Sequence, residues 1–223
     1  MAELIQGLRA DQVRANLERV REEIAHERND DVEILAAVKY LPTAELLVLA
    51  EAGVRLLGEN RAQALEVKAQ AHPGRFTWDF IGHLQSRKVR QILTHVRLIH
   101  SVASDSVLEQ LDRHANPDTE VLIEVNVARE PGKSGIDPEE LPAFLERCPV
   151  RVAGLMTMPP FTEEPERSRP HFAALRELAA AHGLGRLSMG TSQDYLVAVQ
   201  EGATIIRLGS TLYRALRVPA GAS

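Results

Sequence analysis

Eight short apolar runs, each followed by a stretch with helical periodicity, constrain the fold of this chain more than any other feature of its sequence. The runs lie at residues 34–38, 54–57, 76–81, 96–100, 120–125, 150–155, 186–189 and 204–207. Continuous apolar strands separated by helices indicate a parallel sheet that is covered on its outer face. Eight such units in 223 residues favour a closed, TIM-type (β/α)8 barrel over an open doubly wound sheet. No Gly-x-Gly-x-x-Gly turn supports a dinucleotide-binding fold.

The segment before the first apolar run predicts an extra N-terminal helix. Its apolar residues recur at helical spacings of four, three and four, at Val13, Leu17, Val20 and Ile24. No linker rich in Pro, Gly or Ser divides the chain. Residues 1–223 are therefore predicted to form a single domain, with a frayed tail after Arg217.

Composition limits the partners and the location that we expect. A formal net charge of −5 disfavours nucleic acid or an anionic membrane as the main partner. No apolar run reaches the length of a membrane span, and the N-terminus lacks the apolar core of a signal peptide, so we expect a cytoplasmic protein. The single Cys148 predicts neither an internal disulfide nor a cysteine-based metal site.

Polar side chains follow most of the predicted strands. In a barrel of this type, functional groups lie at the C-terminal ends of the strands. These ends carry Lys39, residues 59–60, residues 82–83, Ser101, Asn126, residues 156–157, residues 188–192 and residues 207–211. The set contains no cluster of His, Asp and Glu suited to a metal ion, so we expect a site without metal.

Two turns after the last two strands, at residues 189–192 and 208–211, share a glycine followed by hydroxyl residues. Glycine lets a phosphate approach the backbone, while free amides and hydroxyls donate hydrogen bonds to it. Barrels commonly build a phosphate site after strands seven and eight. The alternative is that Ser192 and Ser210 only cap helices. Because the two turns occur together at these strands, phosphate binding is the favoured interpretation.

Lys39 follows the first strand and is the candidate nucleophile. The alternative is a solvated lysine, which is the usual environment of this residue. A desolvated lysine near other cations has a lowered pKa, and its neutral amine can attack an aldehyde. A phosphate site opposite such an amine indicates a phosphorylated carbonyl ligand. These residues alone do not distinguish pyridoxal 5'-phosphate (PLP) from the sugar-phosphate substrate of an aldolase.

The sequence resembles the pyridoxal phosphate homeostasis protein family (YggS/PROSC), which is similar to the barrel domain of alanine racemase. The matching segments are residues 36–39, 58–61, 80–86, 154–157, 187–190 and 207–211, in the family's order. The resemblance implies that Lys39 binds PLP as a Schiff base and that Arg207 lies beside the pyridine nitrogen. It places four phosphate ligands at Ser192, Gly209, Ser210 and Thr211.

The resemblance also places Asn60 and Met156 near the PLP ring, with a helix cap and ordinary core packing as their respective alternatives. His83 is predicted to be a hydrogen-bonded structural histidine rather than an acid or base. The chain departs from the family pattern at Asp79, where histidine is common, at Thr191, where methionine is usual, and at residues 212–213, where a Phe-Gly pair is usual.

We expect a non-enzymatic PLP-binding protein that serves vitamin B6 homeostasis and amino-acid balance, with PLP-dependent apo-enzymes as recipients and no catalytic residue of its own. The alternative is a PLP-dependent amino-acid racemase or a weak transaminase. A two-base racemase needs a second proton donor on the opposite face of the ring. Tyr40 follows Lys39 on a predicted strand, so its side chain is expected on the face of that strand opposite to the Lys39 side chain. A closed barrel leaves no sheet edge, which favours a monomer.

Overall fold

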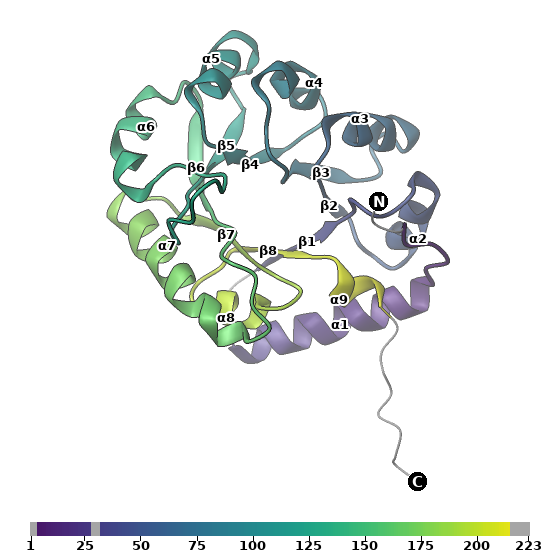
Figure 1. The fold of residues 1–223 in the computed structure, drawn as a ribbon. Helices are drawn as coiled ribbons and strands as arrows, with labels where there is room; N and C mark the ends of the chain where they lie inside the picture. Colours follow the sequence, from purple (N-terminus) through teal and green to yellow (C-terminus); the bar gives the residue numbers. More distant parts are fainter. Residues whose placement is uncertain (1–3, 28–31, 215–223) are drawn as a thin grey trace.

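The computed structural model, which describes residues 4–27 and 32–214, is a closed barrel of eight parallel strands in sequence order, with β8 paired to β1. Figure 1 shows the strands as an inner ring and the helices as an outer ring. The strands are β1 (Glu33–Ala37), β2 (Leu56–Glu59), β3 (Thr77–Phe80), β4 (Leu98–Val102), β5 (Glu120–Glu124), β6 (Arg151–Met156), β7 (Arg186–Thr191) and β8 (Ile205–Leu208). The predicted (β/α)8 barrel is confirmed.

The predicted strand ends are shifted where an apolar residue belongs to the preceding turn. The second run begins at Val54, but β2 begins at Leu56. Val54 donates its N–H to the carbonyl oxygen of Leu49 at 2.9 Å, so it closes the end of a helix although it is buried. An apolar run therefore indicates which residues are buried, and it does not mark where the strand begins, because the turn before the strand is buried as well.

The outer ring consists of α1 (Ala10–Glu27), α2 (Leu46–Glu51), α3 (Ala62–Ala71), α4 (Val89–Leu93), α5 (Asp105–His114), α6 (Leu141–Arg147), α7 (Arg169–Ala181), α8 (Tyr195–Gln200) and α9 (Ser210–Tyr213). Short 3-10 segments precede four of them: η1 (Thr43–Glu45), η2 (Ser86–Lys88), η3 (Pro138–Glu140) and η4 (Pro165–Ser168). The predicted N-terminal helix is α1, which packs against α2, α8 and α9 (Figure 1). All four apolar residues that predicted α1 are buried.

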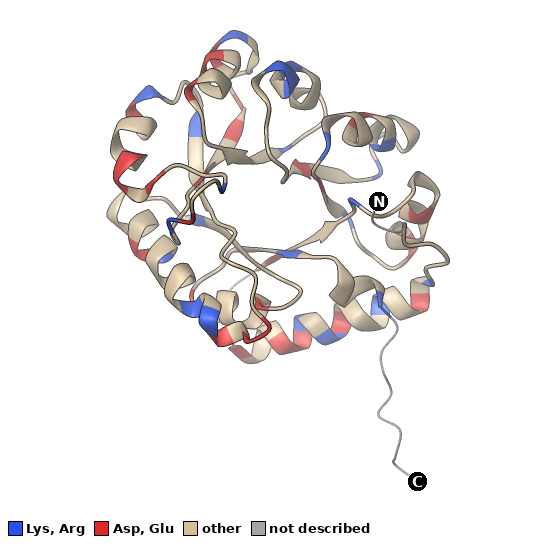
Figure 2. Ribbon diagram, viewed as in Figure 1, with Lys and Arg blue, Asp and Glu red and all other residues tan. Residues whose placement is uncertain are grey.

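Two apolar cores hold the barrel together. The larger core lies between the strands and the helices, and the smaller core fills the barrel interior with Leu35, Leu98, Leu122, Met156 and Ile205. Below the inner core, at the N-terminal ends of the strands, charged side chains form a basal ion layer of Glu33, Arg97, Glu120, Arg151 and Arg186. Charged residues therefore occur on the strands as well as on the helices (Figure 2).

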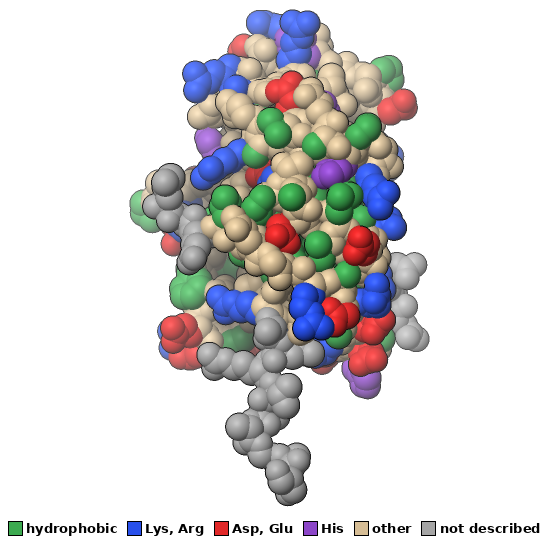
Figure 3. All heavy atoms as spheres, turned by 90° about the vertical axis from the view of Figure 1, so that its right-hand side faces the viewer, with side chains coloured by type: hydrophobic (Ala, Val, Ile, Leu, Met, Phe, Trp, Pro, Cys, Tyr) green, Lys and Arg blue, Asp and Glu red, His purple; other side chains and the backbone are tan. Residues whose placement is uncertain are grey.

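The surface carries scattered apolar side chains, including Leu47 on α2 and Val67 on α3, which are 41% and 60% exposed. On the face shown in Figure 3, hydrophobic side chains lie among charged ones. Within residues 4–27 and 32–214, no helix has the length and apolar character needed to cross a membrane. The single-domain, monomeric and cytoplasmic expectations stay predictions. The expected fraying after Arg217 concerns residues outside those ranges.

Candidate functional site

The candidate site lies at the mouth of the barrel, by which we mean the C-terminal ends of the parallel strands. The predicted site residues lie here: Lys39 follows β1, Asn60 follows β2, Met156 ends β6, Ser192 follows β7, Arg207 lies in β8, and Gly209, Ser210 and Thr211 follow β8. Parallel strand order alone therefore gathers residues from five strands at one end of the molecule.

Ser192 joins the two turns that follow β7 and β8. Its Oγ accepts hydrogen bonds from the backbone N–H groups of Gly209 at 3.1 Å and Thr211 at 3.2 Å. The Thr211 hydroxyl donates to the carbonyl oxygen of Ser192 at 3.2 Å. The two turns thus lie side by side, while their role toward a phosphate stays a prediction.

The helix-cap alternative takes a different form from the one expected. The N-cap of α8 is Asp194, whose Oδ1 accepts hydrogen bonds from the backbone N–H of Thr191 at 2.7 Å and from its hydroxyl at 3.1 Å. Ser192 instead bonds amides at the start of α9, across the two turns. Ser210 is the first residue of α9, and its hydroxyl has no hydrogen-bond partner among the described residues.

Arg207 is a buried cation that makes no ion pair with the residues of the described ranges. Its side chain points into the barrel, and the residue is 5% exposed. Nη1 donates to Ser188 Oγ at 2.6 Å, and Nη2 donates to the carbonyl oxygen of Thr157 at 2.9 Å. No carboxylate in the described part of the chain lies within ion-pair distance. Burial lowers the pKa of Arg207 to about 10, although the charges of Asp194 and Glu124 oppose the shift. The guanidinium therefore stays charged at neutral pH.

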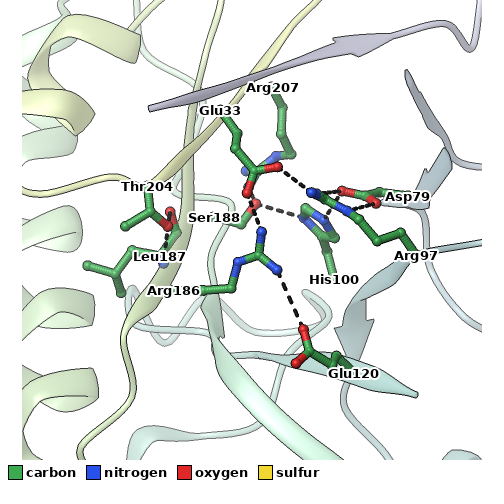
Figure 4. A network of polar contacts seen from close by, with 10 residues as sticks. All are labelled: Glu33, Asp79, Arg97, His100, Glu120, Arg186, Leu187, Ser188, Thr204 and Arg207. Atoms are coloured by element: carbon green, nitrogen blue, oxygen red, sulfur yellow. Dashed lines mark hydrogen bonds and ion pairs between the residues drawn. The ribbon is translucent and has the colours of Figure 1, made fainter. Parts of the chain in front are cut away.

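A chain of polar side chains connects Arg207 to the interior of the barrel (Figure 4). Ser188 Oγ lies 2.8 Å from His100 Nδ1, and His100 Nε2 lies 3.1 Å from Asp79 Oδ2. Arg97 donates to Asp79 from Nε at 3.1 Å and from Nη2 at 2.7 Å. Asp79, His100 and Ser188 have no exposed surface. The sequence noted Asp79 only as a departure and did not identify this chain of contacts.

Lys39 lies in the turn after β1, and its side chain is exposed. The desolvated amine that we predicted is therefore not what the structure shows. The expectation for Tyr40 is also wrong, because β1 ends at Ala37 and the alternation of a strand does not extend to residues 39–40. Instead, Lys39 Nζ lies 4.6 Å from the centroid of the Tyr40 ring, in a cation–π contact.

The backbone before Lys39 is held by groups that the sequence did not indicate. Lys68 is 6% exposed, and its Nζ donates to the Val38 carbonyl oxygen at 2.7 Å and to Glu59 Oε2 at 2.5 Å. Glu59 Oε1 accepts the backbone N–H of Asn60 at 2.8 Å. The buried Lys68–Glu59 pair thus joins the end of β1 to the end of β2. A polar residue at an inward position of α3 was the only signal in the sequence.

Asn60 carries an orphan atom. Its buried Oδ1 has no hydrogen-bond partner within the described ranges. The N-cap of α3 is Arg61, so the helix-cap alternative for Asn60 is not supported. Gly82 packs directly on the Asn60 backbone, because a Cβ at position 82 would lie 2.1 Å from the Asn60 carbonyl oxygen. Glycine at this position lets the loops after β2 and β3 meet.

Met156 is buried in the inner core, whereas His83 is exposed at the surface. Met156 is 2% exposed and packs in the inner core against Leu35, Leu98, Leu122 and Ile205, as its core-packing alternative stated. A contact of Met156 with a ligand stays a prediction. His83 is exposed and has no hydrogen bond to any described residue, so the expected structural histidine is wrong. It lies in the loop after β3, between the buried residues Gly82 and Leu84.

Glu124 is a buried carboxyl group at the mouth that the sequence did not identify. It is 5% exposed, and Ser134 Oγ donates to its Oε1 at 2.5 Å. Burial raises the pKa of Glu124, and the Ser134 hydrogen bond opposes that shift. Glu124 lines a cavity of about 190 Å³ whose rim includes the exposed side chains of Met158 and Phe161. Among the described residues, no group of three or more His, Cys, Asp or Glu is arranged to hold a metal ion.

Comparison with known proteins connects this geometry to characterised relatives. The family described as "Alanine racemase, N-terminal domain" matches residues 8–216. The pyridoxal phosphate homeostasis protein of Aquifex aeolicus is 38% identical over 213 residues, which cover 88% of this chain and 93% of that protein. The structure of PipY from Synechococcus elongatus with PLP bound is 32% identical, with a TM-score of 0.79, and covers 91% of this chain and 100% of that chain.

The barrel of an enzyme is similar at lower identity. Alanine racemase from Corynebacterium glutamicum matches with a TM-score of 0.73 at 17% identity, over 99% of this chain and 66% of the enzyme chain, which shows a shared fold only. The family match and the relatives above 30% identity agree with each other. This chain therefore belongs to the alanine racemase N-terminal domain family and, within it, to the pyridoxal phosphate homeostasis proteins.

Proposed function

We propose that this chain binds PLP at the mouth of the barrel, holds its aldehyde on Lys39 as a Schiff base, and serves PLP homeostasis and amino-acid balance. The observation that carries the proposal is the buried Arg207, which has no ion pair with a described residue and lies at the same mouth as the Ser192–Gly209–Thr211 cluster. A buried cation without a counter-ion is costly, so such a group calls for an acceptor or anion from outside the chain. PLP supplies both a ring nitrogen and a phosphate.

Three features of the chain fit this cofactor. Ser192, Gly209, Ser210 and Thr211 gather hydroxyl and amide groups of the kind that bind phosphate. The orphan Asn60 Oδ1 is a buried acceptor without a donor, which a ligand group can satisfy. Lys39 provides a primary amine on a loop whose backbone is fixed through Val38. We propose Met156 as part of the apolar floor.

The charge of Arg207 favours a carrier over an enzyme. When bound, PLP supplies an electron sink whose strength depends on protonation of its ring nitrogen. A guanidinium that remains charged up to a pKa of about 10 opposes protonation of a neighbouring nitrogen. Ser188 and Thr157 hold this guanidinium in place. We therefore propose that the chain retains and releases PLP, with PLP-dependent apo-enzymes as its recipients, rather than turning over a substrate.

Glu124 favours one second candidate, a slow proton-transfer activity such as racemisation or transamination. A buried carboxyl group with a raised pKa can act as a general acid or base. The test is α-deuteration of L-amino acids in deuterated water by PLP-loaded protein, comparing Glu124→Gln with Glu146→Gln, an exposed control. Turnover near about 1 per second or faster that is lost only in Glu124→Gln would replace the carrier with an enzyme.

The proposed function is tested by absorbance and covalent trapping. Purified protein mixed with PLP should show a visible band, and borohydride should fix PLP on Lys39. Peptide mapping identifies the modified residue, and Lys88→Ala serves as the control for Lys39→Ala. The proposal fails if the adduct maps only to Lys68, Lys88 or Lys133.

A further inference from the structure

The polar chain inside the barrel contains three groups that PLP binding alone does not require. Ser188 lies between Arg207 and His100, and His100 lies between Ser188 and Asp79 (Figure 4). These residues come from β7, β4 and β3 and meet inside the barrel. An apolar residue at each position would fill the same space without burying polar atoms. The polar residues therefore need a reason other than packing.

The hydrogen-bonding capacity of each group fixes the direction of the hydrogen bonds from Arg207 to Asp79. A carboxylate only accepts hydrogen bonds, so His100 Nε2 carries the proton that is donated to Asp79. In a neutral imidazole the other nitrogen then accepts, so Ser188 donates its hydroxyl proton to His100 Nδ1. Arginine only donates, so Ser188 Oγ accepts from Arg207. Only this arrangement of protons gives an acceptor to every donor among Arg207, Ser188, His100 and Asp79.

The neutral state of His100 is consistent with its surroundings. Burial lowers the pKa of His100, and the hydrogen bond and charge of Asp79 oppose that shift. Arg97 already neutralises Asp79 through two hydrogen bonds. A protonated His100 would donate from Nδ1 to Ser188 Oγ, and the Ser188 hydroxyl proton would then have no acceptor among these groups.

We propose that Asp79, His100 and Ser188 form a one-directional hydrogen-bond relay that positions Arg207 as a donor toward the ring nitrogen of the bound ligand. The inference rests on the proposed PLP site. The three are positioning residues, because they act through Arg207 and do not contact the ligand. With Nη1 held by Ser188 and Nη2 held by Thr157, the plane of the guanidinium is fixed before the ligand arrives.

The first test examines the relay without any PLP. Nitrogen NMR of protein labelled with 15N-histidine should show His100 as a neutral ring, protonated at Nε2 and bare at Nδ1, at neutral pH. The His100→Gln variant assigns the signal by its loss. A ring protonated at Nδ1, or at both nitrogens, would overturn the relay and leave the PLP site itself untouched.

The second test separates positioning from a purely structural role. Ser188→Ala should weaken PLP binding by about ten-fold, and Ser188→Thr should restore it, because threonine keeps the hydroxyl. The same loss should be small for 1-deaza-PLP, an analogue that lacks the ring nitrogen. Ser101→Ala is the control, since Ser101 is buried on β4 and bonds the Gly82 carbonyl outside the relay. Equal weakening of both ligands by Ser188→Ala would show a structural role and reject the proposal.

Discussion

Charged side chains in the basal ion layer and two charged side chains at the mouth, Arg207 and Glu124, differ in whether they form ion pairs. In the basal ion layer, Glu33 pairs with both Arg97 and Arg186, and Glu120 pairs with Arg151 and Arg186. At the mouth, Arg207 has no ion pair among the described residues, and Glu124 is neutralised by no direct partner there. The basal carboxylates are thus paired within the chain, and the buried Lys68–Glu59 pair shows that the mouth also holds a paired charge, whereas Arg207 and Glu124 have no ion pair with a described residue. The difference indicates which polar residues hold the fold and which serve function.

Removal of a paired arginine should have the largest effect on stability. Arg97→Met leaves the fully buried Asp79 with only His100 beside it. Breaking a buried pair from one side costs about 3 kcal/mol of unfolding free energy, at the lower end because Arg97 is partly exposed. Urea denaturation measures the change in unfolding free energy. The comparison between the two ends fails if Arg97→Met unfolds at the same urea concentration as the parent chain.

Loss of a hydroxyl at the phosphate cluster should act on ligand binding instead. Ser192→Ala removes the group that bonds Gly209 and Thr211 and that we expect to meet the phosphate. A hydrogen bond to a charged group contributes roughly 1.5–3 kcal/mol, or about ten- to hundred-fold in affinity. Titration should therefore show a larger loss for PLP than for pyridoxal, which has no phosphate. Equal losses for the two ligands would remove Ser192 from the phosphate site.

Buried His100 should make stability depend on pH in a known direction. Because its pKa is lowered in the folded chain, the unfolded chain binds more protons between that lowered value and the ordinary value near 6.5. Stability should then fall as pH drops below about 6.5, with a slope of at most about 1.4 kcal/mol per pH unit. Asp79, Arg97, Arg207 and Ser188 face the ring and belong to the same equilibrium.

Urea denaturation at pH 7.5, 6.5 and 5.5 should show a shallower pH dependence for His100→Gln than for the parent chain. His114→Gln is the matched control, because His114 lies exposed in the last turn of α5. An identical slope in the parent chain and in His100→Gln would mean that His100 does not titrate as its burial requires.

Much of the fold followed from the sequence because it depends on local pattern. Eight apolar runs with helices between them allow few topologies, and parallel order then places the turns after β7 and β8 together. The Asp79–His100–Ser188 contacts could not be predicted in this way. They depend on strand register and on inward orientation across the barrel, where His100 and Ser188 are 88 positions apart.

The errors at the mouth have a related cause. The exposure of Lys39 and His83 depends on where each strand ends, and a shift of one or two residues changes the direction in which a side chain points. Glu124 lies within the apolar run at residues 120–125, and it is one of the four buried residues among the five of β5. A hydrophobic pattern identifies buried strands, but it does not identify a buried polar residue on such a strand that belongs to a binding site.

Removal of the unpaired arginine should have the smallest effect on stability and gives the sharpest test of the comparison. Arg207 and Arg97 are both arginines bonded into the polar interior, but in the described part of the chain only Arg97 pairs with carboxylates. Arg207→Met removes a buried cation, whose desolvation disfavours the folded chain, together with hydrogen bonds to Ser188 and Thr157. These effects oppose each other, so we expect the unfolding free energy to change by less than about 1 kcal/mol. PLP binding should weaken at the same time, because the acceptor on the ligand loses its donor.

Urea denaturation and PLP titration on the same samples measure both quantities, with Arg97→Met as the partner variant. If Arg207→Met destabilises the chain as much as Arg97→Met does, the mouth is built for stability in the same way as the basal ion layer.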